Sequence, residues 1–174
     1  MTRFRRAAAA LGLAIALLGP AWTGASSADA QAQRPPPAAS SADCQIFEIK
    51  ATNEAEGVDP ALRDLARKLK KPPFSSWKTF KLLKKHEKKV EKMKTLNVGL
   101  ATGSKLSLLF RGATGGQPTK PRLRLTFTLD DKAGKRKVDG TINIDSGDYS
   151  LFGGETIEGG GTYILAVSCT ATAP

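Results

Sequence analysis

Arg122-Leu-Arg-Leu-Thr-Phe-Thr-Leu129 alternates polar and apolar residues without a break. Successive side chains of a β-strand point to opposite faces, so Leu123, Leu125, Phe127 and Leu129 share one face of such a strand. A strand of this kind packs one face on a core and exposes the other face to water. The stretch therefore predicts a half-buried strand of an antiparallel sheet.

Segments with strand patterns lie on both sides of this stretch. We predict strands at 44–51, 80–83, 96–100, 106–110, 138–144 and 163–167. The last of these is apolar on both faces, which is typical of a central strand. Turn residues separate several of the segments, so that 96–110 and 122–144 are each expected to form a hairpin. We expect a loop over 111–121, because this stretch contains three glycines and two prolines.

One helix is expected before the second strand. Asp59 followed by Pro60 is a helix-start signal, because Asp accepts a backbone hydrogen bond and Pro suits the first helical position. Leu62, Leu65 and Leu69 follow at helical spacing, and two prolines at 72–73 end the segment. The predicted fold class is mainly β, an antiparallel β-sandwich or open barrel with one N-terminal amphipathic helix (about 60–70) packed on it.

The N-terminal region is typical of a secretory signal peptide, over residues 1–30. Arg3, Arg5 and Arg6 precede an uncharged apolar run at 7–18, and Ala28 and Ala30 bracket the residue between them. The apolar run is shorter than the roughly 20 residues that span a bilayer, so we expect no transmembrane segment in the mature chain. A Pro-, Ala- and Ser-rich linker at 31–43 then leads into a single domain at 44–171. The expected location is the periplasm or the extracellular space.

The chain has two cysteines, Cys44 and Cys169, and they lie at the two ends of this domain. Exported proteins enter an oxidising compartment, so we predict a disulfide that joins the first and last strands. Two buried free thiols are the alternative. Two cysteines and one histidine are too few for a typical metal site, and we expect neither a metal nor another cofactor.

Positive charge is concentrated in one part of the chain. Residues 62–94 contain thirteen Lys or Arg residues and three acidic ones, so this segment carries +10 of the net charge of +11. Such a segment attracts polyanions, and an anionic component of the cell envelope is the expected partner. The candidate anion-binding residues are Lys70, Lys71, Lys84, Lys85, Lys88, Lys89 and Lys92. A solubilising face is the alternative, and the pattern leaves open whether 84–94 is helix, strand or loop.

Other motifs favour structural roles over chemistry. The glycines at 153–161 precede a strand instead of a helix and lack the Lys of a phosphate loop, which favours a turn. His86 lies among lysines and is expected to be solvated, with no positioned Ser or Cys to make it catalytic. Few aromatic residues accompany the lysines, so sequence-specific binding of nucleic acid is not expected.

The sequence as a whole indicates an exported, non-enzymatic binding or structural module with a Lys-rich face for anionic surfaces. An interaction subunit of an envelope assembly is one alternative, and a hydrolase with an unrecognised site is another.

Overall fold

The computed structural model describes residues 39–54, 57–117, 120–157 and 159–172, and most of them belong to strands of two sheets. Sheet A consists, in spatial order, of β2 (Gly57–Val58), β3 (Thr79–Glu91), β1 (Ser41–Thr52), β9 (Thr162–Thr172) and β8 (Tyr149–Thr156). Sheet B consists of β4 (Thr95–Gly99), β5 (Lys105–Gln117), β6 (Lys120–Asp130) and β7 (Arg136–Asp145). The long strands pair antiparallel, and the short β2 pairs parallel with β3.

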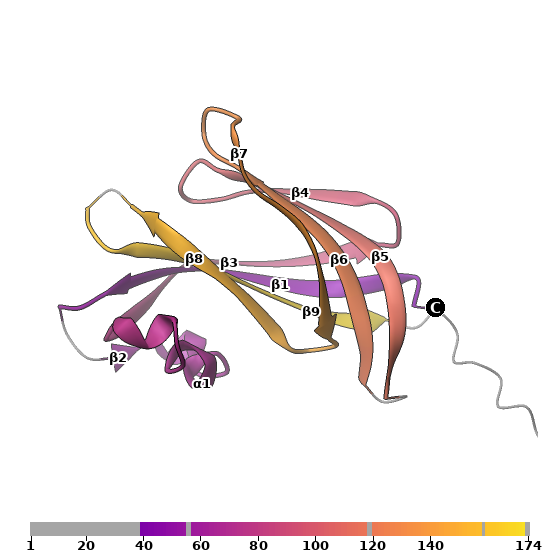
Figure 1. Ribbon diagram of the computed structural model, residues 1–174, viewed down its shortest axis with the longest axis horizontal. Coiled ribbons are helices and arrows are strands. Elements are labelled where there is room, and N and C mark those ends of the chain that lie inside the picture. Colours follow the sequence, from indigo (N-terminus) through magenta and orange to yellow (C-terminus); the bar gives the residue numbers. More distant parts are fainter. Residues whose placement is uncertain (1–38, 55–56, 118–119, 158, 173–174) are drawn as a thin grey trace, which may run out of the picture. The chain divides into compact units, whose positions relative to one another are not determined.

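The two sheets pack face to face, which confirms the predicted sandwich (Figure 1). The apolar side chains of the 122–129 stretch lie where the alternation places them, since Leu123, Leu125 and Phe127 are buried between the sheets. Ile46 of β1 and Leu165 of β9 belong to the same core. Burying one such side chain contributes about 1.5–3 kcal/mol, so this inter-sheet core is a main source of stability.

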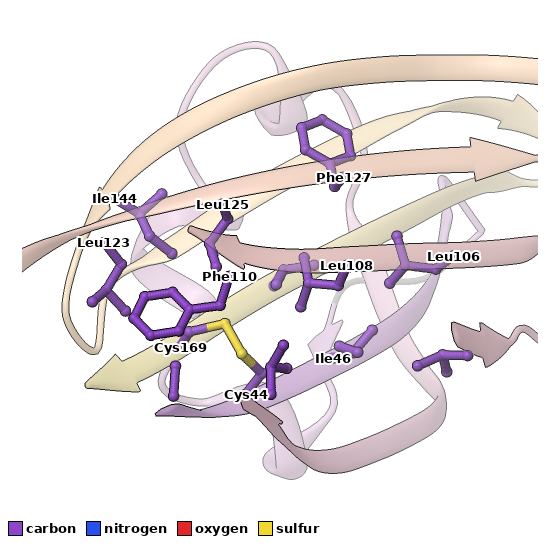
Figure 2. Close-up of a cluster of buried hydrophobic side chains, with 14 of the residues drawn as sticks. Cys44, Ile46, Leu106, Leu108, Phe110, Leu123, Leu125, Phe127, Ile144 and Cys169 are labelled. Atoms are coloured by element: carbon purple, nitrogen blue, oxygen red, sulfur yellow. A yellow bond between two sulfur atoms is a disulfide. The ribbon is translucent and has the colours of Figure 1, made fainter. Parts of the chain in front are cut away.

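A disulfide between Cys44 and Cys169 closes the domain and confirms the predicted pairing of the first and last strands. The two cysteines lie directly opposite each other on the adjacent strands β1 and β9. Figure 2 shows the bridge among apolar side chains of both sheets, and both cysteines are buried.

The segment before β3 covers the other face of sheet A. It contains a 3-10 helix at Pro60–Leu62, a single α-helical turn, α1 (Ala66–Leu69), and a second 3-10 helix at Phe74–Ser76. Its leucines are buried in a second core against sheet A, as the spacing predicted: Leu62, Leu65 and Leu69.

The helical segment is not the single continuous helix that the sequence predicted for residues 60–70. Most of its backbone hydrogen bonds between Asp59 and Lys71 join residue i to residue i−3, which is the tighter 3-10 winding. With three residues per turn, Leu62 and Leu65 lie above each other, so the sheet-facing leucines reach the core without a regular α-helix.

Strand β3 is much longer than the predicted strand at 80–83. It pairs with β1 from Thr79 to Glu91, and Leu83 occupies an irregularity in this register. The backbone pairing is independent of side-chain polarity, and long lysine side chains extend into water from either face of the strand. The sequence left the structure of 84–94 open: residues 84–91 are β-strand, and residues 92–94 form the turn that leads into β4.

The predicted loop at 111–121 is wrong in most of its length. Strand β5 continues to Gln117 and β6 begins at Lys120, so the two strands form one long hairpin. The glycines are absorbed as irregularities in the pairing, between Phe110 and Gly112 and again between Thr114 and Gly116.

The predicted signal peptide (1–30) and most of the predicted linker (31–43) lie outside the described residues. Strand β1 begins at Ser41, so pairing in sheet A starts three residues before Cys44. No helix in the described part of the chain has the length and apolar character needed to cross a bilayer.

Candidate functional site

Most of the candidate lysines lie on one edge of sheet A. Strand β2 pairs only with Thr79 and Phe80, so β3 has no neighbour on that side of sheet A from Lys81 onward. We call the exposed lysines of β3 beyond Phe80, together with the lysine that follows the strand, the lysine edge: Lys81, Lys84, Lys85, Lys88, Lys89 and Lys92. Lys92 lies just after β3, where its backbone forms a bridge with Phe110 of β5. A strand rises about 3.3 Å per residue, so this row of cations is about 35 Å long.

The lysines project to both faces of the edge strand. The ammonium group of Lys85 lies 5.2 Å from the centre of the Phe47 ring, on the face that the helical segment partly covers. His86, the next residue, points to the opposite face, toward the inter-sheet core. Alternation then places Lys89 with Lys85, and Lys84 and Lys88 with His86.

Few carboxylates neutralise the lysine edge. Lys85 pairs with Glu87 at 2.6 Å, and Lys94, just beyond the edge, pairs with Glu91. The other lysines of the edge have no carboxylate within 4.0 Å among the described residues. Their charges remain available to an external anion.

The remaining two candidate anion-binding residues, Lys70 and Lys71, do not belong to the lysine edge. Both are exposed and directly follow α1. Lys70 lines a shallow depression together with Lys78 and Phe80, which is at the start of β3. The predicted set is therefore divided into a row along β3 and a smaller basic area at its N-terminal end.

A buried carboxylate fixes the middle of this edge. Glu48 of β1 is completely buried, and its Oε1 lies 2.7 Å from Nε2 of His86. Its Oε2 accepts hydrogen bonds from the backbone N–H of Ala101 at 2.6 Å and from the hydroxyl of Tyr163 at 2.7 Å. Three strands of sheet A and the turn between β4 and β5 are thus joined at one side chain.

The hydroxyl of Tyr163 keeps its proton and donates it in the hydrogen bond to Glu48. Burial, together with the hydrogen bond to Glu48 and the negative charges of Glu48 and Glu155, raises the pKa of its hydroxyl well above the ordinary value. The side chain of His86 is 10% exposed. The prediction of a solvated histidine is therefore wrong, because the alternation of β3 turns this residue inward onto a buried carboxylate.

The roles of Glu48 and Tyr163 were not predicted from the sequence. The available signal was a glutamate inside the apolar run Ile46-Phe47-Glu48-Ile49, in a chain with one histidine. A carboxylate in such a run must find partners when it is buried, but their identity depends on which strands become neighbours. Since Glu48 has no exposed surface, we assign this cluster a structural role.

Comparisons with protein-family models, with curated proteins and with solved structures find no match to this chain. Among the described residues, no group of three or more His, Cys, Asp or Glu side chains is arranged to hold a metal ion. The geometry and charge of the lysine edge make it the candidate functional site.

Proposed function

We propose that the protein is an exported binding module whose lysine edge attaches it to a polyanion of the cell envelope. The observation that carries this proposal is a row of lysines along one unpaired strand edge, most of them with no carboxylate within 4.0 Å in the part of the chain that the structure describes. A linear array of point charges matches a linear polyanion, and lysine ammonium groups bind anions without demanding a fixed geometry.

Export is part of the proposal. The buried disulfide between Cys44 and Cys169 is typical of a protein that folds in an oxidising compartment. Together with the signal-peptide pattern at the N-terminus, it supports a location in the periplasm or outside the cell.

Lysines on an edge strand also have a second effect, because they prevent the strand from pairing with another chain. Pairing between strands is opposed by charge of either sign, whereas a polyanion is attracted only by positive charge. Replacing lysine with glutamate therefore separates the two effects.

The test is binding of the mature protein to heparin resin and to polyphosphate at increasing salt. Reversing Lys84, Lys85, Lys88 and Lys89 to glutamate should abolish retention on heparin while the protein stays monomeric and folded. Parent binding should fall steeply between low and moderate salt, because the Debye length shrinks to about 8 Å at physiological ionic strength.

A matched control reverses four exposed cations elsewhere, none of them ion-paired among the described residues: Lys105, Arg124, Lys132 and Lys135. This control has the same net charge as the test variant, so it should lose far less binding if position matters. Equal retention of the parent and the β3 variant would overturn the proposal. Equal loss in the β3 variant and the control would reduce the interaction to net charge and overturn it as well.

A further inference from the structure

Two exposed apolar side chains accompany the lysine edge. Leu83 is 42% exposed and Met93 is 62% exposed, and no other large apolar side chain in the described part of the chain is exposed. Single exposed apolar residues are common on folded proteins. These two, however, both belong to the Lys-rich segment: Leu83 lies within the row of lysines, and Met93 lies one residue beyond its end.

The backbone of Met93 adopts a conformation that does not favour methionine. Its φ is 63°, in the left-handed region that Gly and Asn enter most readily. Its N–H donates to the carbonyl of Phe110 at 2.8 Å, so the turn after β3 is tied to β5 while the Met93 side chain extends into water. The turn itself gives no reason for a large apolar residue at this position, and backbone strain of this kind is concentrated at functional surfaces.

Lysines directly flank both apolar residues. Lys84 follows Leu83, and Met93 stands between Lys92 and Lys94. Both glutamates of β3 are already paired with lysines, so they add no free negative charge to this surface. An apolar side chain between ammonium groups is typical of an interfacial anchor, in which the apolar group enters the acyl boundary and the lysines reach the lipid phosphates.

This combination matches an anionic lipid bilayer better than a dissolved polyanion. Each lysine near a negatively charged membrane strengthens binding about fivefold. An apolar side chain adds to this only where an apolar phase lies beneath the phosphates, which a heparin or polyphosphate chain does not provide. The strand rise separates Leu83 from Met93 by roughly 30 Å, so the two residues and the lysines between them form an extended contact for a flat surface.

We infer that the lysine edge binds the surface of an anionic phospholipid bilayer, with Leu83 and Met93 inserted at the level of the headgroups. The inference rests on the proposed function and names its partner. Insertion adds a hydrophobic contribution that salt does not screen. Part of the binding to vesicles should therefore survive at a salt concentration that abolishes retention on heparin.

The experiment is sedimentation of the mature protein with vesicles of phosphatidylglycerol and phosphatidylcholine, with retention on heparin measured in parallel. Met93→Asn suits the left-handed backbone and removes the apolar side chain, so it should weaken vesicle binding about tenfold. Leu83→Ser should act in the same direction. Neither variant should change retention on heparin, because every lysine remains. Met93→Leu keeps an apolar side chain and should bind the vesicles like the parent.

Met93 also permits a test without a substitution. The other methionine of the chain is residue 1, so mild treatment of the mature protein with hydrogen peroxide transfers oxygen to the sulfur of Met93 alone. The two cysteines are joined in a buried disulfide. The sulfoxide is polar and should weaken vesicle binding about as much as Met93→Asn does, and methionine sulfoxide reductase should restore it.

The outcomes separate this inference from the proposed function. If Met93→Asn and the oxidised protein bind the vesicles as the parent does, or lose vesicles and heparin equally, the bilayer inference fails and the lysine edge remains. Retention of the parent on heparin without binding to the vesicles would overturn it in favour of a dissolved polyanion. Failure of the proposed function has a different signature, namely that reversing the four β3 lysines changes neither vesicle binding nor heparin retention.

Discussion

Glu48 connects sheet A to the turn between β4 and β5 through polar contacts. Moving an ionised carboxylate out of water costs several kcal/mol unless hydrogen bonds compensate for it. Here both oxygens are engaged, by His86 on one side and by Ala101 and Tyr163 on the other. The cluster therefore holds strand β3 and the β4–β5 turn in a defined position relative to β1.

Removing this carboxylate should be strongly destabilising. We expect Glu48→Ala to lower the free energy of unfolding by about 3–5 kcal/mol, because it leaves buried donors without an acceptor. Tyr163→Phe removes one donor and should cost about 1–3 kcal/mol. Urea denaturation followed by circular dichroism measures both. The exposed Asn97→Ala should change stability by less than about 0.5 kcal/mol, and equal small effects from all three variants would contradict a structural role for the cluster.

Asp148 gives the stability a predictable dependence on pH. Partial burial opposes its charged form, but the hydrogen bond from Lys68, the backbone N–H of Tyr149 and the charges of Lys68 and Lys120 outweigh this and lower its pKa. A carboxyl with a lowered pKa stabilises the folded state above its unfolded pKa of about 3.9, and this contribution is lost as the pH falls through the folded pKa.

The Asp148→Asn variant tests this dependence. It should be less stable than the parent at pH 7, and the difference should shrink when both are measured by urea denaturation near pH 3. The exposed Asp64→Asn serves as the control and should show no such trend. A difference that is absent at pH 7, or that grows on acidification, would rule out this account of Asp148.

Contacts between individual side chains were the features hardest to predict from the sequence. Cys44 and Cys169 were paired correctly, because two cysteines allow one intramolecular bridge. The partners of His86 were not predictable, since Glu48 is 38 residues away and the contact depends on the register of β1 with β3. Short-range patterns describe which face a residue occupies, but not which residue of another strand lies opposite.

At the scale of elements, β3 is both a fully paired strand on one side and an exposed edge on the other. Its backbone pairs with β1 over its whole length, while its outer edge is free of any neighbour in sheet A beyond Phe80. The irregularity at Leu83 and the lysines on both faces discourage further pairing of that edge. The same features that protect the edge also create the charged surface that we propose binds an anion.

Strands with alternating apolar residues were predicted well, and β3 was not. The sandwich strands β4, β5 and β6 carry the period-two pattern because one face is buried and the other is wet. Beyond Phe80, β3 contributes only Val90 to the buried core, so this part of its sequence does not alternate between apolar and polar residues. An edge strand with little burial is therefore hidden from an analysis based on hydrophobic periodicity.

A substitution at Leu65 tests whether the helical segment packs against sheet A. Leu65 is almost completely buried in the second core, and we expect Leu65→Asp to lower the free energy of unfolding by about 3–5 kcal/mol. The neighbouring Asp64 is exposed, so Asp64→Ala should have little effect. Thermal or urea unfolding of the two variants provides the comparison, and small effects of both would mean that the segment contributes little packing.

For the domain as a whole, stability depends on contacts between its chain ends. The outer strands of the sequence, β1 and β9, are adjacent in the middle of sheet A and contribute to both hydrophobic cores. Their pairing closes a very long loop, which is entropically costly and slow to form. The bridge between Cys44 and Cys169 lies directly on this pairing and limits the freedom of the unfolded chain.

Reduction of this bridge should therefore affect the entire domain. The cysteines are 125 residues apart, and the chain-entropy model assigns such a loop roughly 4–5 kcal/mol of stabilisation. The double variant Cys44→Ala and Cys169→Ala should show this loss in urea denaturation, with little change in the circular dichroism of whatever folded fraction remains.

Protein recovered from an exporting host should begin near Gln31 or Gln33, with an intact mass about two daltons below that of the reduced chain. Two thiols that react with an alkylating agent in the folded protein, or an unprocessed N-terminus, would contradict export into an oxidising compartment. A double variant as stable as the parent would instead show that the strand pairing alone holds the chain ends together.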